Sequence, residues 1–238
     1  KEPGFHEEVA KAFEQAIGLT LPPDRELLEL ERLEYFYVHG RQEEVCALAP
    51  LLERNDTVGP RAMFFHALAL EEVGRVDEMR RLMERLAEDK TTAIGLTAGA
   101  FLAFIADDFR GALRLSDAAV EIDASFPPTV RIQALALVGT GQAEQAEMRL
   151  KTIEDVAGDW PRVLRLKLIL HSKLGRTRDA LRAAERMVEM SEPTPTAHAL
   201  ASCGQARMML GDHASAIPYF DRALTVDETL INSRVLRG

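Results

Sequence analysis

The stretch GDHASAIPYFDRAL, residues 211–224, contains the pattern that decides the fold of this chain. It begins with a glycine, and Ala216, Phe220 and Ala223 follow that glycine by 5, 9 and 12 residues. These offsets place the three side chains on one face of an α-helix. Because Asp212 and His213 beside the glycine are also typical of a catalytic loop, the first question is whether the context recurs.

The context of Gly211 recurs along the whole chain at a nearly constant interval. Equivalent turn positions, here called marks, follow one another at steps of 36, 34, 33, 34, 34 and 36 residues: Gly4, Gly40, Gly74, Asp107, Gly141, Gly175 and Gly211. Five residues after each of the last four marks stands an alanine: Ala112, Ala146, Ala180 and Ala216. Such a period indicates an array of structural repeats rather than a single catalytic loop.

The residues at fixed offsets from the marks predict two antiparallel helices in each repeat. Glycine can adopt a positive φ and end the first helix in a left-handed cap, and aspartate is among the few other residues that tolerate this conformation. Seven residues before the marks the side chains are mostly small, as at Ala67, Ala134 and Gly204, so the two helices can approach closely. No segment alternates as a half-buried strand does, and the fold class is therefore all-α.

This pattern resembles the tetratricopeptide repeat, a 34-residue helix–turn–helix unit with small and large residues at the same positions. The best match comprises Leu200, Gly204, Gly211, Ala216, Phe220 and Ala223. The resemblance implies one right-handed superhelical α-solenoid over residues 1–238. It would contain a partial repeat at 1–22, repeats at about 26–59, 60–92, 93–126, 127–160, 161–196 and 197–230, and a partial repeat at 231–238. The partial repeats lead us to expect a longer natural chain.

The sequence departs from the repeat pattern around the second mark. Pro50 falls inside the second helix expected after Gly40, and we expect it to kink or shorten that helix. The repeat that contains Gly40 is also the weakest match, because Glu29 and Arg32 stand where apolar residues are expected.

Composition places the chain among ordinary globular proteins. Apolar residues make up 47% and charged residues 28%, and no apolar run reaches the roughly 18 residues that a membrane span needs. Cys46 and Cys203 belong to no motif and are interpreted as buried structural cysteines, which favours a reducing compartment such as the cytoplasm over the periplasm. Frequent arginine and alanine with little lysine favour a bacterial source.

The charge of the chain is unevenly distributed. The formal net charge is −9, which argues against general nucleic-acid binding. Residues 1–58 hold six Lys or Arg and thirteen Asp or Glu, whereas residues 161–186 hold eight Lys or Arg and two acids. The second segment is therefore a local basic block that could form a partner surface.

No motif in the sequence supports a catalytic, cofactor or metal site. HEEVA at residues 6–10 lacks the second histidine of a zinc-peptidase motif, and GTGQAE at 139–144 lacks the third glycine of a dinucleotide loop. The histidines never pair at helical spacing. We therefore expect a non-catalytic chain without a cofactor.

The resemblance instead implies a concave binding surface lined by the first helices. Counting back from the marks selects the candidate peptide-binding residues: Arg61, Phe64, Leu68, Phe101, Phe104, Arg131, Leu135, Arg162, Arg165, Ile169 and Lys173. An apolar centre beside a basic stripe favours a protein or peptide partner with apolar anchors and acidic flanks. The alternative is that some of these apolar residues belong to the core.

Three other functions compete with peptide binding. The chain could be the regulatory or substrate-recruiting arm of a larger enzyme, such as a glycosyl- or sulfotransferase. RNA binding rests only on the basic block at 161–186 and is opposed by the net charge of −9. Finally, exposed terminal repeats would offer surfaces for homo-oligomer formation.

Overall fold

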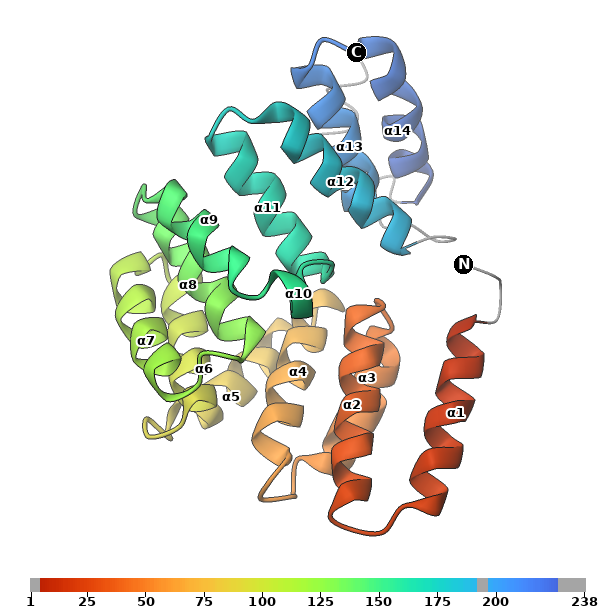
Figure 1. Cartoon of the computed structure of the whole chain (residues 1–238), viewed down its shortest axis with the longest axis vertical. Helices are drawn as coiled ribbons and strands as arrows, with labels where there is room; N and C mark the ends of the chain where they lie inside the picture. Colours follow the sequence, from red (N-terminus) through yellow and green to blue (C-terminus); the bar gives the residue numbers. More distant parts are fainter. Residues whose placement is uncertain (1–4, 192–196, 227–238) are drawn as a thin grey trace. The chain divides into compact units, whose positions relative to one another are not determined.

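The structure is a computed structural model that describes residues 5–191 and 197–226. Within these ranges the regular structure consists of α-helices alone, in agreement with the predicted fold class (Figure 1). The helices are α1 Phe5–Leu19, α2 Asp24–Val38, α3 Gln42–Leu52, α4 Gly59–Glu72, α5 Val76–Ala87, α6 Ala93–Ile105, α7 Phe109–Ile122, α8 Pro127–Gly139, α9 Ala143–Lys151, α10 Glu154–Ala157, α11 Pro161–Lys173, α12 Thr177–Ser191, α13 Ala197–Met209 and α14 His213–Val226.

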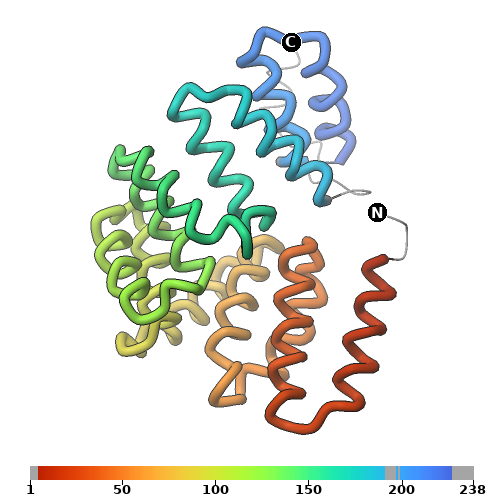
Figure 2. The backbone as a smooth tube through the Cα atoms, viewed as in Figure 1, coloured from red at the N-terminus to blue at the C-terminus, as the bar shows by residue number. Residues whose placement is uncertain are grey.

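The chain divides into two compact units, Lys1–Thr140 and Gly141–Gly238, here called unit 1 and unit 2. In unit 1 each helix packs against the next along the chain, and the first helices α2, α4, α6 and α8 also pack on one another in turn. In unit 2, α9 packs against α11, and α11 to α14 each pack against the next helix. The backbone trace in Figure 2 shows the same hairpin in every repeat. One continuous superhelix through both units stays a prediction.

Every predicted mark within the described residues has a left-handed backbone. The φ angles are +72° at Gly40, +81° at Gly74, +58° at Asp107, +82° at Gly141, +68° at Gly175 and +79° at Gly211. Gly4, the remaining mark, lies outside the described residues. The prediction that these positions cap the first helices is therefore confirmed at six marks.

The hydrogen bonds at the marks explain why each first helix ends where it does. At Gly74 the glycine N–H donates to the Glu71 carbonyl at 3.2 Å, and the next N–H, from Arg75, donates to the Leu70 carbonyl at 2.8 Å. This pair of bonds, the Schellman motif, satisfies the last carbonyls and reverses the chain. It recurs at Gly40, Asp107, Gly175 and Gly211.

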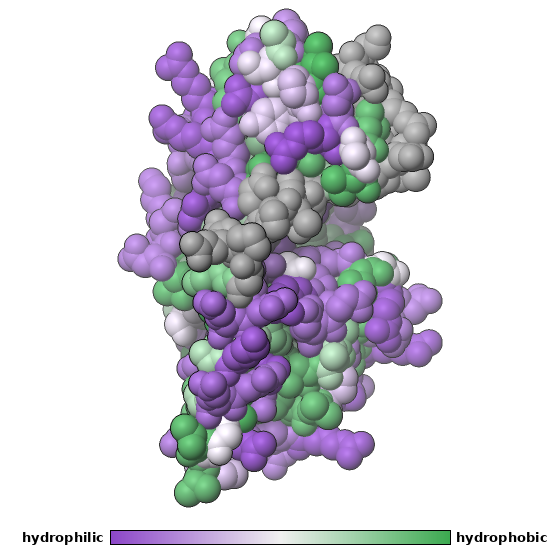
Figure 3. Space-filling model, turned by 90° about the vertical axis from the view of Figure 1, so that its right-hand side faces the viewer, coloured by the Kyte–Doolittle hydropathy of each residue, from purple (hydrophilic) through white to green (hydrophobic). Residues whose placement is uncertain are grey.

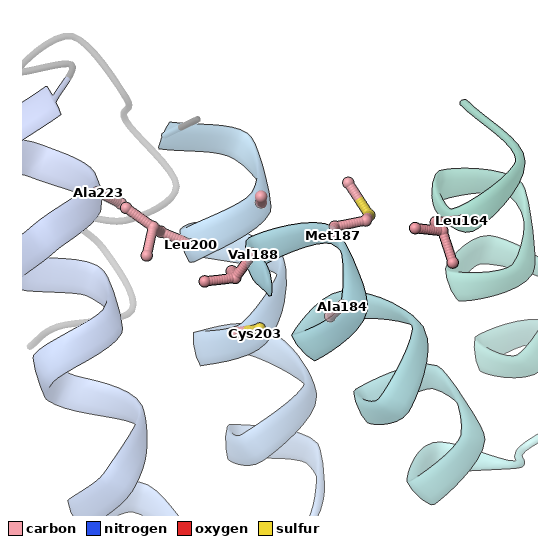
Figure 4. Close-up of a cluster of buried hydrophobic side chains, with 8 residues drawn as sticks. Leu164, Ala184, Met187, Val188, Leu200, Cys203 and Ala223 are labelled. Atoms are coloured by element: carbon pink, nitrogen blue, oxygen red, sulfur yellow. The ribbon is translucent and has the colours of Figure 1, made fainter. Parts of the chain in front are cut away.

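Small residues allow the two helices of a repeat to cross closely. The residues five positions after the six described marks are 0–2% exposed: Val45, Met79, Ala112, Ala146, Ala180 and Ala216. Gly204 lies directly against the Phe220 ring, because a Cβ added there would come within 2.6 Å of it. Figure 4 shows the neighbouring core of unit 2, formed by side chains from four helices: Leu164, Ala184, Met187, Val188, Leu200, Cys203 and Ala223.

Two second helices are interrupted. Helix α3 continues through Pro50 and ends two residues later at Leu52, where the ring has removed one backbone donor. The second helix after Gly141 is divided into α9 and the short α10, with Ile153 outside helical conformation at the break.

The close crossing at Gly204 predicts a large effect of a single methyl group. Gly204→Ala should lower the free energy of unfolding by about 1–3 kcal/mol, because Phe220 must move to admit the Cβ. The matched control is Gly99→Ala in α6, where the new Cβ meets only ordinary contacts at 3.5 Å and beyond. That change should stabilise the helix by about 0.5–1 kcal/mol. Urea denaturation measures both, and equal effects would contradict the assigned packing.

The left-handed marks predict a second, purely conformational effect. Gly74→Ala should destabilise the protein by about 1–2 kcal/mol, although nothing lies within 4 Å of the added Cβ. Asp107→Gly should cost nothing, since glycine adopts the same φ without strain. Thermal unfolding of the two variants tests this contrast, and a Gly74→Ala variant as stable as the parent would refute it.

Candidate peptide-binding surface

In unit 1 most of the predicted lining residues belong to the core. Phe64, Leu68 and Phe101 are 0%, 1% and 3% exposed, and Arg131 is also buried. These side chains cannot contact a ligand without rearrangement, so their burial supports the alternative in which they are core residues. Phe104 and Leu135 are half-buried and remain at the surface.

Phe126, which the sequence analysis did not select, contributes to the burial of Phe64. This residue directly precedes α8, yet its ring packs edge-on against Phe64 and Phe65 of α4, with centroids 5.5 and 6.2 Å apart. Such arrangements stabilise aromatic pairs beyond the area they bury. The chain's own phenylalanine therefore occupies the place where a ligand anchor would meet Phe64.

Arg61 is also engaged within unit 1. Its Nε lies 2.6 Å from Glu34 Oε1 of α2, and its guanidinium lies over the Phe126 ring, 5.2 Å from the centroid. Burial raises the pKa of Glu34 above its ordinary value, and the positive charge of Arg61 opposes that shift. Arg61 thus links α2, α4 and the start of α8, and this engagement competes with any contact to a partner.

In unit 2 the predicted stripe on α11 is accessible. Arg165, Ile169 and Lys173 are exposed, while Arg162 is half-buried. The three exposed residues are spaced by four and lie on one face of the helix, about 6 Å apart along its axis. They form an apolar position between two cations.

Most other cations of the basic block at 161–186 are paired. Lys167 Nζ lies 2.7 Å from Glu154, Arg176 Nη1 lies 2.6 Å from Glu147, and Arg186 binds both Asp159 and Glu189. By contrast, Arg165, Lys173 and Arg178 form no ion pair with any described residue. The unneutralised charge of this block therefore lies mainly beside Ile169 and at the following turn.

Helix α13 carries residues at the same offsets from its mark as the α11 stripe. Gln205 and Met209 are exposed, Ala201 and Met208 are half-buried, and the Met208 sulfur is 3.1 Å from His213 Nδ1. The α11 and α13 helices share one core cluster through Leu164, Ala199 and Leu200. We call the exposed face of these two helices the α11–α13 surface: Arg165, Ile169, Lys173, Ala201, Gln205, Met208 and Met209.

The two cysteines differ in their surroundings. Cys203 is buried as expected, and this burial raises its pKa to about 12, which keeps the thiol protonated at neutral pH. Cys46 is only half-buried, so the expectation of a fully buried residue is wrong there.

Two further features of the described ranges bear on function. There, no group of three or more His, Cys, Asp and Glu side chains could hold a metal ion. In the same part of the chain, no helix combines the length and the apolar character that crossing a membrane requires.

Comparison with known proteins places the fold. No protein-family model matches the chain, and the search of curated proteins found no match. Solved structures do match: the thermophilic TPR protein TTC0263 of Thermus thermophilus has a TM-score of 0.59 and 19% identity over 74% of this chain and 95% of its own. The chain has the tetratricopeptide-repeat (TPR) fold.

Two further TPR structures extend the likeness. YrrB, described as a TPR protein with an unusual peptide-binding site, has a TM-score of 0.53 and 14% identity over 73% of this chain and 89% of its own. A chain of the APC/C hetero-tetramer Cut9–Hcn1 has a TM-score of 0.60 and 15% identity over 98% of this chain, which spans 52% of that protein. At these identities the likeness concerns the fold, and TPR folds generally serve as protein-interaction scaffolds.

The contacts of Phe126 predict a large cost for its removal. Phe126→Ala should lower the stability of unit 1 by about 3–5 kcal/mol, because it empties the space between Phe64 and Phe65. Phe5→Ala serves as the control, since Phe5 is 42% exposed and should change stability far less. Chemical denaturation compares the two, and a small effect at Phe126 would show that Phe64 owes its burial to other residues.

Proposed function

We propose that this chain is a non-catalytic interaction module that binds an acidic protein segment with apolar anchors on the α11–α13 surface. The observation that carries the proposal is the exposed stripe Arg165–Ile169–Lys173, whose cations have no acidic partner among the described residues. Two fixed cations on either side of an apolar side chain complement an apolar residue flanked by carboxylates.

The adjacent α13 residues support an apolar anchor. Met209 is 55% exposed and Leu210, at the following turn, is 40% exposed. Methionine is unbranched and polarisable and adapts to differently shaped partners. The α11 helix would therefore supply charge selection, while α13 would supply adaptable apolar contact.

The proposal narrows the set of residues predicted from sequence. Arg162, Arg165, Ile169 and Lys173 of that set lie on α11, with Arg162 at the half-buried edge. Phe104 and Leu135 are accessible in unit 1 and could contact a second part of the partner. We do not include Arg61, Phe64, Leu68, Phe101 or Arg131, because their present contacts or burial compete with ligand binding.

The proposal predicts a charge-specific loss of affinity. The probe is a fluorescent synthetic peptide with leucines four residues apart and flanking glutamates. Arg165→Glu should weaken its binding about threefold to thirtyfold, measured by fluorescence anisotropy at low salt. Arg182→Glu is the matched control: it makes the same change in net charge, and its side chain is 79% exposed on α12 beside Asp179.

Salt and RNA provide the remaining arms of this experiment. Affinity for the acidic peptide should fall as the salt concentration rises, since exposed charges are screened. Equal losses in the Arg165 and Arg182 variants would reduce the effect to net charge alone and contradict the proposal. Tighter binding of a single-stranded RNA than of the acidic peptide would favour the competing nucleic-acid function.

A further inference from the structure

Helix α1 carries an apolar face that lacks the cover found in every other described repeat. The positions 5, 9 and 12 residues after the mark are buried in all six repeats whose marks are described, as at Ala216, Phe220 and Ala223. Counted from Gly4, the same positions in α1 are Val9, Phe13 and Ala16, and these three are only half-buried. The single buried residue of α1 is Ile17.

The contacts of α1 show which side of the helix is already covered. It packs against α2, where Phe13 meets the Tyr35 ring at 5.9 Å and His6 Nδ1 lies 2.7 Å from the Tyr35 hydroxyl. Arg32 of α2 also pairs with Glu14 at 3.2 Å. These contacts replace the interface between a second helix and the next repeat, so the face that remains open is the one that a first helix covers elsewhere.

The repeat ending in α14 indicates what kind of helix would fit this face. Among the described second helices after the six marks, α14 alone has phenylalanine nine residues after its mark, as α1 has Phe13. The helix that covers Phe220 has a glycine at the crossing, and even a Cβ on that glycine would approach the ring to 2.6 Å. A helix crossing Phe13 at the same distance therefore needs glycine, or at most alanine, at that point.

We propose that the open face of α1 is a docking site for one amphipathic helix of first-helix type, with glycine or alanine where it crosses Phe13. The site continues the series of helix–helix interfaces described above. Its rim is acidic, since Glu7, Glu8 and Glu14 of α1 are exposed and only Lys11 opposes them. The docked helix is thus apolar and small-residue-rich on one face and basic at its edges. Figure 3 turns this side of the molecule to the viewer, and apolar patches lie among charged side chains in its lower part.

The chain itself provides a probe for this site. A labelled peptide of residues 197–211 reproduces α13, the helix that covers Phe220, with Cys203 replaced by alanine. A staple between positions 201 and 205, which lie on the accessible face of α13, holds the peptide helical. Binding is measured by fluorescence anisotropy against the full chain.

We expect saturable binding that Phe13→Asp weakens about tenfold or more, because the aspartate removes the buried ring contact. Leu51→Asp is the control, since Leu51 is 76% exposed on α3, away from this face. A second peptide with Gly204→Leu should bind as weakly, and this comparison needs no change in the protein. Two results would overturn the proposal: equal binding of the two peptides, or a dimer of the chain, found by sedimentation, that Phe13→Asp abolishes.

Discussion

The left-handed residue at each repeat turn is the constraint on which this structure depends. Two backbone hydrogen bonds fix the chain around it, as the 2.8 Å bond from Arg75 to Leu70 illustrates at Gly74. Because the turn sets where both helices begin and end, the residues at fixed offsets always meet. A small residue such as Gly204 then lies against a large one such as Phe220 in the same repeat.

This constraint also separates residues that hold the fold from residues that can meet a partner. Positions that face the second helix are buried throughout the six described repeats, whereas the accessible positions of the first helices vary between the units. In unit 1, Phe126 and the Arg61–Glu34 pair occupy the centre of that surface. In unit 2, Arg165 and Lys173 remain exposed on either side of Ile169. The same repeat thus supplies a filled surface in one unit and an accessible one in the other.

The fold was predictable because its signals are local. The spacing of the marks and the chemistry of glycine identify the turns, and only a few residues around each turn determine its geometry. The exposed α11 stripe was predictable for the same reason, since it depends on helical spacing alone. The burial of Phe64 was not, because it involves a contact with Phe126, which lies 62 residues further along the chain. No periodic pattern encodes such a contact, nor the pairing of Arg61 with Glu34 across 27 residues.

The central claim is that the partner binds the α11–α13 surface, and methyl NMR during titration with the acidic peptide tests it most directly. The methyl signals of Ile169, Met208 and Met209 report on that surface, while Ile94 and Ile105 of α6 report on the accessible part of unit 1. Our account predicts dose-dependent shifts at the first three methyl groups and little change at the α6 pair. Shifts confined to Ile94 and Ile105, or no shift at Ile169 while the peptide binds, would contradict it.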